Sequence, residues 1–332
     1  MAPELITAYA FGELLSARRL LQQFSDNNIA QADWTLTQAY YLSMGSVRLV
    51  SKDGYEIPIC KCIQSGDGWD VPSCNPDLVD LIKMEKISLP RISDRDVQDR
   101  NKADIFTKLF TLGQSIWFIF NSLARAAGDL PLCPLEISSL AYVFCTAITY
   151  ACWWNKPKDI LTTSVIPDGI VVADLPEELR DRISSFDPLQ DAPCHYRWQT
   201  LALPSTEAEI LAIIRQRYSA IVGLVTGLAF CCIHLSAWNF EFATDAERTL
   251  WKTCSVASAT IPLLSFLAVF LRSLSPKKFD SMWTIVLSVY CSIMLVYTFS
   301  RLILCFIMFT SLRRLPRGSF TSMNWALEMP HI

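Results

Sequence analysis

Five long apolar stretches, separated by polar segments, dominate the chain after its first hundred residues. They cover residues 105–127, 135–154, 218–240, 250–271 and 282–312. Each is long enough to cross a hydrocarbon layer, which takes about 20 largely apolar residues in a helix. Water does not reach the backbone at that depth, so each stretch should be an α-helix. The pattern predicts an all-α, multi-pass membrane helix bundle over residues 104–312, with a polar loop at 155–217 and a tail at 313–332.

The first 103 residues have a different pattern. Apolar positions recur at helical spacing over residues 2–24 with charges between them, which predicts an amphipathic helix that is too polar to span and lies at the membrane interface. Alternating apolar residues flank Asp53 and Gly54, which is typical of a β-hairpin. Ser93 and Asp96 fit a capping box at the start of a juxtamembrane helix. We therefore expect a small polar lobe that contains a short hairpin.

Composition agrees with a membrane protein. Of the 332 residues, 52% are hydrophobic and 18% are charged, whereas about a quarter are charged in an average soluble domain. The net charge is −3 and no Lys/Arg run is dense, which excludes nucleic acid as an expected partner. Twelve cysteines and three histidines show no zinc-ligand spacing beyond a single "CKC". We expect a bilayer as the partner, an endoplasmic-reticulum or other endomembrane location, and no metal or cofactor.

Basic residues near the apolar stretches bear on topology. Lys and Arg before residue 105, and Lys156 and Lys158 after the second stretch, favour the cytoplasm, and the acidic link at 241–247 favours the far side. Arg272 and Arg313, however, flank the last stretch in sequence, each with further basic residues beside it. One span cannot have both ends in the cytoplasm, so the side of the C-terminus is left open.

Polar residues within the apolar stretches form two stripes at helical spacing. The first follows one helix face at Gln114, Trp117, Asn121 and Arg125. The second contains the following residues, with Glu136 one turn before them: Ser139, Tyr142, Thr146, Tyr150 and Trp153. The short link makes the two helices antiparallel neighbours, so Arg125 and Glu136 should lie close enough to pair.

Two interpretations of these stripes remain. In the first, they line a pocket in which Glu136 is a buried acid whose protonation is set by Arg125. In the second, the two charges only pin the helical hairpin together, because an unpaired charge at membrane depth costs about 2.5–3.5 kcal/mol. Arg301, with Tyr297 one turn before it, lies in another apolar stretch and would either reach the surface or bind an anionic group.

Several segments in order along the chain resemble a large group of fungal integral-membrane proteins. They are "APE", "DWTLTQAYYLSMG", "VQDRNKADIFTKLFTLGQSIWFIFNSLARAAGDLPLCPLEISSLAYV", "TYACWWNKPKDI" and "SRLILCFIMFTSLRRLPRGSFTSMNWALEMPHI". The resemblance implies a fungal source and a multi-span helical fold, and it carries no established common activity. It singles out these polar and aromatic positions: Glu4, Trp34, Asp99, Lys102, Asp104, Lys108, Gln114, Trp117, Arg125, Glu136, Trp153, Trp154, Lys156 and Pro157. Two departures are "MGS" in place of "MGG" and the lack of apolar sequence before "APE".

The sequence supports two hypotheses about function. The first is a metal-free cyclase or isomerase of fungal specialised metabolism, which converts a lipophilic terpenoid or prenylated epoxide by acid-initiated cyclisation inside the bundle. Its acid would be Glu136, and its substrate would be lined by Gln114, Trp117, Asn121, Arg125, Tyr142, Tyr150, Tyr297 and Arg301. The alternative is a non-catalytic scaffold, sensor or partner subunit, in which interhelical hydrogen bonds of about 0.6 kcal/mol each explain the stripes.

Overall fold

The computed structural model of the protein describes residues 3–26, 34–43, 47–50, 56–58, 94–157, 164–167, 207–274 and 283–321. The chain divides into two compact units. Unit 1 comprises residues 1–8, 109–149 and 220–332, and unit 2 comprises residues 9–108 and 150–219. Four helices, α1, α4, α5 and α7, contribute residues to both units.

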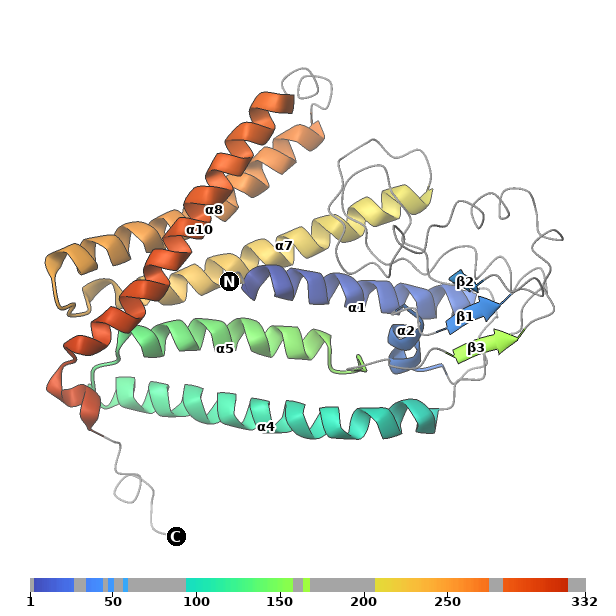
Figure 1. Cartoon of the computed structure of the whole chain (residues 1–332), viewed down its shortest axis with the longest axis horizontal. Helices are drawn as coiled ribbons and strands as arrows, with labels where there is room; N and C mark the ends of the chain where they lie inside the picture. The colour runs from blue at the N-terminus through green and yellow to red at the C-terminus, as the bar shows by residue number, and fades with distance from the viewer. Residues whose placement is uncertain are drawn as a thin grey trace, which may run out of the picture. The chain divides into compact units, whose positions relative to one another are not determined.

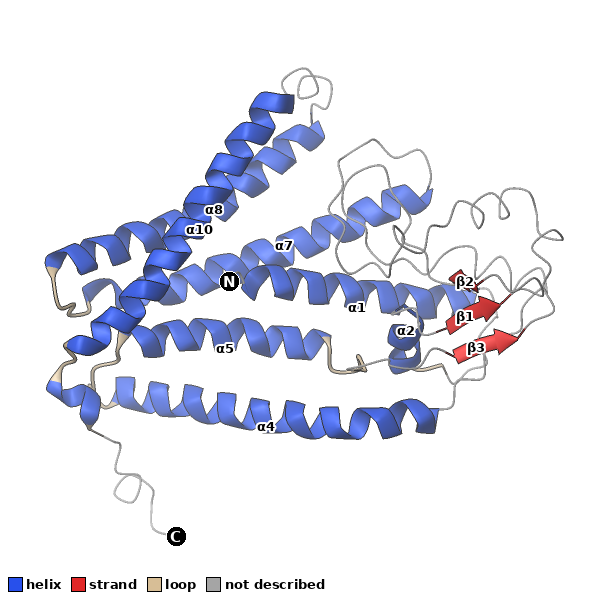
Figure 2. Ribbon diagram, viewed as in Figure 1, coloured by secondary structure: helices blue, strands red, loops and turns tan. Residues whose placement is uncertain are grey.

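Helices account for most of the described residues, as the apolar periodicity predicts (Figures 1 and 2). The long helices are α1 (Pro3–Asp26), α4 (Asp94–Ala127), α5 (Pro134–Cys152), α7 (Glu207–Leu235), α8 (Asp245–Leu274) and α10 (Trp283–Thr310). The shorter ones are α2 (Leu36–Ser43) and the 3-10 turns η2 (Ser236–Asn239), η3 (Ser311–Arg313) and η4 (Arg317–Phe320). Helix α4 begins eleven residues before the predicted span, since its charged first turns are helical too.

Three of these helices, in the part of the chain that the structure describes, are long and apolar enough to cross a membrane. The windows are Pro134–Cys152, Ile221–Asn239 and Leu295–Arg313, and they fall in the predicted spans 135–154, 218–240 and 282–312. The predicted spans 105–127 and 250–271 are helical, within α4 and α8, but are not among the three. In α4, Lys108, Gln114, Asn121 and Arg125 lower the mean hydropathy.

Three short strands form one sheet in unit 2 (Figure 2). Strand β1 (Val47–Val50) pairs antiparallel with β2 (Glu56–Pro58) and parallel with β3 (Ser164–Pro167). The first two strands flank the Asp53-Gly54 sequence, which itself lies outside the described residues. Strand β3 comes from the segment expected to be a polar loop, so the sheet is larger than a two-stranded hairpin.

Hydrogen-bonded caps fix where the helices begin. At α5, the backbone N–H of Cys133 donates to Oε2 of Glu136 at 2.7 Å, and the N–H of Glu136 faces Sγ of Cys133 at 3.4 Å. This is a capping box with a cysteine in the usual Ser/Thr position, followed by Pro134 at the first helical position, where proline is favoured. Thr35 and Gln38 form the equivalent box at α2. The box expected at Ser93 lies outside the described residues.

The apolar core of unit 1 has two parts. One joins α5, η2, α8 and α10 through Ile137, Ala237, Trp251, Cys254, Leu304, Ile307 and Met308. The other joins α5 and α7 through Ala141, Cys145, Phe230 and Cys231. Helices α8 and α10 also pack along each other. In unit 2, Ala10, Ala17, Leu20 and Phe24 of α1 are buried, and Phe24 packs edge-on against Trp34 at 5.3 Å.

Candidate functional site

A buried group of polar side chains joins α1 to α10 inside unit 1. The guanidinium Nη2 of Arg301 lies 3.1 Å from Oε1 of Glu4. The side chains of Arg301 and Glu4 are only 8% and 5% exposed, so both charges are removed from solvent. Tyr297, one turn before Arg301 and half-buried, donates its hydroxyl to Glu4 Oε1. It accepts from Arg301 Nε at 3.1 Å and Nη2 at 2.8 Å.

Two glycines of α7 let α1 approach closely enough to place Glu4 in this group. A Cβ on Gly223 would lie 3.0 Å from the Cβ of Ala8, and a Cβ on Gly227 would lie 3.4 Å from Cγ of Glu4. Glycines four residues apart lie on one helix face and allow the close helix contacts seen in membrane bundles. Gly223 and Gly227 are therefore the positions that bring the first turns of α1 against α7.

Aromatic rings surround the polar group. The guanidinium carbon of Arg301 lies 4.1 Å from the ring centre of Phe230, within the range of a cation–π contact. His234 packs on Phe230 at 4.5 Å and is stacked with Trp251 at 5.8 Å. Tyr142 meets Phe230 edge-on at 5.2 Å. The charge of Arg301 thus lies in an aromatic shell drawn from α5, α7, α8 and α10.

Hydroxyl groups extend the site along α1 and α5. Thr7 Oγ1 lies 3.1 Å from Thr149 Oγ1 and 3.3 Å from the carbonyl oxygen of Cys145. Thr7 is fully buried. These contacts attach the N-terminal turns of α1 to α5, as Gly223 and Gly227 attach them to α7.

One carboxylate oxygen in this site has no hydrogen-bond partner among the residues that the structure describes. Glu4 Oε1 is shared by Arg301 and Tyr297, whereas Glu4 Oε2 is buried and makes no hydrogen bond among the described residues. Leaving such an oxygen unsatisfied costs about 1–3 kcal/mol, and more for a charged group. A free acceptor next to a tyrosine hydroxyl and an arginine can take a proton or bind a donor group.

The predicted pairing of Arg125 with Glu136 is present at a second position of unit 1, between Nη1 and Oε1 at 3.6 Å. At this position both side chains also make hydrogen bonds to backbone groups. Arg125 Nη2 donates to the carbonyls of Pro131 at 3.0 Å and Ser319 at 3.2 Å, and Glu136 caps α5. Glu136 is 22% exposed in its side chain. The contacts of this pair therefore fix the α4–α5 turn and attach η4 to it.

The other residues predicted to line a pocket lie in different surroundings. Gln114 and Trp117 are exposed and Asn121 is half-buried, so within the predicted α4 stripe it is Arg125 that is buried. Ser122, which is not in the stripe, is buried as well. The reason is that the large apolar residues of α4 point outward. Tyr142 and Arg301 both contact Phe230, and Tyr297 is hydrogen-bonded to Arg301. Tyr150 is half-buried and belongs to unit 2.

Sequence reasoning missed Glu4 and Phe230 as site residues. The sequence pattern placed Glu4 on an amphipathic helix at the membrane interface. A phenylalanine of a functional site in an apolar span cannot be distinguished by sequence from a phenylalanine of the apolar core. A usable signal existed for Glu4. An arginine in the middle of an apolar stretch needs an acidic partner, and Glu4 stands in the "APE" segment that carries the family resemblance.

A separate polar cluster lies in unit 2. Glu13 accepts from Trp153 Nε1 at 2.6 Å and from Lys156 Nζ at 2.7 Å, and Lys156 lies 4.6 Å over the Trp153 ring. Lys108, only 5% exposed, donates to the carbonyls of Trp153 at 3.0 Å and Lys156 at 3.1 Å. All of these contacts are made to the segment that follows α5, so this cluster fixes the position of the backbone there.

The helices, the three candidate spans and the buried ion pair are compatible with a membrane protein that crosses the bilayer several times. The chain belongs to a family of unknown function (DUF8562), whose sequence profile matches residues 1–196. The matched region contains Glu4, Lys108, Arg125 and Glu136, and Tyr297 and Arg301 lie beyond it. No curated protein and no solved structure matches the chain.

Proposed function

We propose that this protein is a membrane-embedded isomerase of fungal specialised metabolism, which cyclises a lipophilic terpenoid or prenylated epoxide. In this proposal Tyr297, Glu4 and Arg301 form the reacting group, in place of the Glu136 acid suggested by the sequence. The observation that carries it is the buried Oε2 of Glu4, which has no partner in the described part of the chain, beside a tyrosine hydroxyl that two guanidinium nitrogens already contact. A proton donor and a proton acceptor are thus adjacent in an aromatic environment.

These three side chains can complete a proton cycle without a cofactor. The Tyr297 hydroxyl donates its proton to the epoxide oxygen as the C–O bond breaks, and Nε and Nη2 of Arg301 hold the phenolate. The electron pair of a neighbouring alkene closes the ring on the carbocation. Glu4 Oε2 then removes a proton from the cyclised cation to leave an alkene. After the carboxyl group turns, that proton returns to Tyr297, and the product is an isomer of the substrate.

Glu136 is a poorer candidate for this chemistry because its oxygens are engaged. Oε2 accepts the Cys133 N–H at 2.7 Å, and Oε1 faces Arg125. A proton placed on Glu136 would compete with the cap of α5.

The test is expression of the full chain in a fungal host with epoxy-prenyl precursors. A product that depends on the protein should fall by about 10²–10⁴-fold in Tyr297→Phe, because the general acid is lost while the Glu4–Arg301 ion pair is kept. Glu4→Gln should also abolish it. Glu136→Gln is the matched control and should retain most of the activity. Product formation that survives Tyr297→Phe but disappears in Glu136→Gln would contradict the assignment.

The second candidate is a non-catalytic membrane scaffold, sensor or partner subunit. It is favoured by the many polar contacts that only join or cap helices, such as Lys108 with the end of α5 and Thr7 with Thr149. On this alternative, no precursor changes in the host even though the wild-type protein is present in the membrane fraction, and Tyr297→Phe has no metabolic effect.

A further inference from the structure

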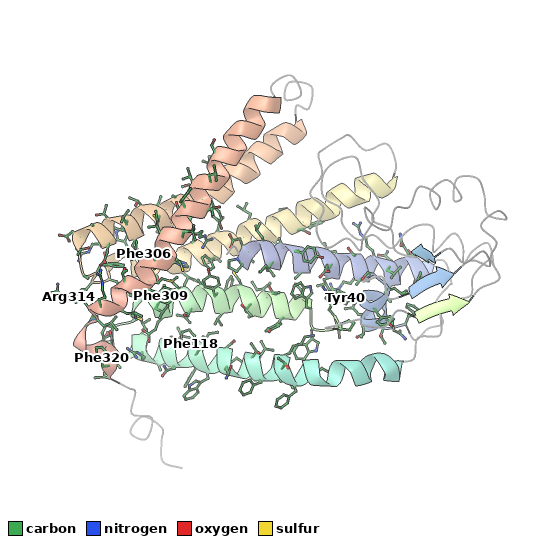
Figure 3. All side chains as sticks on the ribbon, in the orientation of Figure 1. Tyr40, Phe118, Phe306, Phe309, Arg314 and Phe320 are labelled. Atoms are coloured by element: carbon green, nitrogen blue, oxygen red, sulfur yellow. The ribbon has the colours of Figure 1, made fainter. Side chains whose placement is uncertain are left out.

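From Leu295 on, α10 carries a row of large apolar side chains on one face, and two of its polar residues are buried. Ser300 and Arg301 are 6% and 9% exposed. The outward residues are between 54% and 68% exposed, and Figure 3 labels two of them, Phe306 and Phe309; they are Leu295, Val296, Phe299, Leu302, Phe306 and Phe309. This is the reverse of the pattern on a water-facing helix, which buries its apolar stripe.

Helix α4 repeats this reversed pattern within unit 1. Its outward residues are 50% to 65% exposed, and they are Leu109, Phe110, Ile116, Trp117, Phe120 and Leu123. At 3.6 residues per turn they lie on one side of the helix, opposite Ser122 and Arg125, which are 1% and 8% exposed. A hypothetical Cβ on Gly113, on the same outward side, would meet no atom of the described residues within 4 Å.

The first turns of α1 are reversed as well. Leu5 and Ile6 are 56% and 50% exposed, whereas Glu4 and Thr7 beside them are 4% and 0% exposed. The sequence pattern led us to expect an interfacial helix, with its apolar face in the headgroup region and its charges in water. The structure instead places the charge of Glu4 against Arg301 and turns the apolar side chains outward.

From these three faces we infer that residues 109–127 of α4 and the first two turns of α1 lie in the hydrocarbon layer together with α10, and that acyl chains cover their outward residues. Acyl chains solvate large apolar side chains at no cost, whereas soluble proteins rarely expose apolar patches above a few hundred Å². A protein partner would have to cover faces on three helices of one unit. A bilayer surrounds all of them at once, and α10 already contains a candidate span.

The inference is tested with nitroxide labels, introduced as an unnatural amino acid, in the full chain reconstituted in phosphatidylcholine nanodiscs. Labels replace Ile6, Ile116 and Phe299, and a label at Asp245, whose side chain is 99% exposed, is the aqueous control. Collision rates are measured with molecular oxygen, which concentrates in the hydrocarbon, and with a water-soluble nickel complex.

We expect the ratio of oxygen to nickel collisions at Ile6 and Ile116 to match Phe299 and to exceed that at Asp245 severalfold. A ratio at Ile6 or Ile116 like that of Asp245 would show contact with water, and low collision rates with both reagents would show a protein cover. Either result overturns the inference. If a labelled variant fails to fold, Leu5 or Phe120 on the same face takes its place.

Discussion

At the scale of single residues, the buried polar groups of unit 2 hold the backbone where α5 ends. The last carbonyls of a helix have no partner within it, and basic side chains near the C-terminus can bind them. Lys108 donates to three carbonyl oxygens just after the end of α5, those of Trp153, Trp154 and Lys156. Tyr40 adds a fourth bond, from its hydroxyl to the carbonyl of Cys152 at 2.9 Å.

Replacing Lys108 by Met should destabilise the protein markedly. The substitution removes a charged donor that bonds three carbonyl oxygens, and a hydrogen bond to a charged group contributes about 1.5–3 kcal/mol. We expect a lower midpoint of thermal unfolding in detergent. Lys252→Met is the control, since Lys252 is half-buried and lies over the Trp238 ring. Equal midpoints for the two variants would contradict the role given to Lys108.

Tyr40 predicts a dependence of stability on alkaline pH. Burial, followed by the charge of Glu13, raises the pKa of Tyr40. The unfolded chain therefore releases this proton first, at a pKa of about 10, so the contribution of Tyr40 is complete below that pH and declines as the pH rises further. Tyr40→Phe should lower the midpoint of thermal unfolding at pH 8. Between pH 9.5 and 11, the midpoint of this variant should fall by less than the midpoint of the wild type. Parallel declines would contradict this.

At the scale of elements, the sequence predicts the existence and type of the long helices well, because each apolar stretch is long and largely apolar. It predicts boundaries less well: α4 and α7 both begin some eleven residues before their apolar part, since polar helical turns carry no hydropathy signal. Strand β3 was missed because its pairing with β1 is set by a partner more than a hundred residues away.

The candidate site was predictable only in part. The Arg125–Glu136 pair could be inferred from the sequence, because the link between α4 and α5 is short and places the two residues close together. The Glu4–Arg301 pair depends instead on how α1 packs in unit 1. That packing depends on Gly223 and Gly227, whose meaning is clear only once the neighbouring helix is known.

Gly223 provides a test of the contact between α1 and α7. Its Cβ position is already 3.0 Å from Ala8, so Gly223→Leu should push α1 away and destabilise the protein by about 1–3 kcal/mol, as overpacking does. The matched control is Gly113→Leu, where nothing lies within 4 Å. Unfolding midpoints in detergent compare the two, and equal effects would argue against a tight α1–α7 contact.

At the scale of the whole of unit 1, contacts at one end of the helices bear on the topology that sequence left open. Arg313, at the end of α10, pairs with Glu247 in the first turn of α8. Arg125, at the end of α4, donates hydrogen bonds to the backbone carbonyls of Ser319 and Pro131. The end of α10, the start of α8 and the α4–α5 turn are therefore on the same side.

Glycosylation tags should report this arrangement. Acceptor sites inserted at residues 240–244 and after residue 332 are expected to be either both glycosylated or both unglycosylated in microsomes. A site inserted at residues 275–282 should have the opposite glycosylation state. With the segment before α4 in the cytoplasm, the first two should be glycosylated. Different outcomes for the link at 240–244 and the C-terminus would contradict the contacts of Arg313.

The ion pair between Glu4 and Arg301 joins residues 297 positions apart, which has a consequence for biogenesis. At a synthesis rate of about 5–20 residues per second, Arg301 is made roughly 15 to 60 s after Glu4. Throughout that interval the nascent chain carries a carboxylate that lacks its counter-charge. We therefore expect α1 to take its final place in unit 1 only after α10 has left the ribosome.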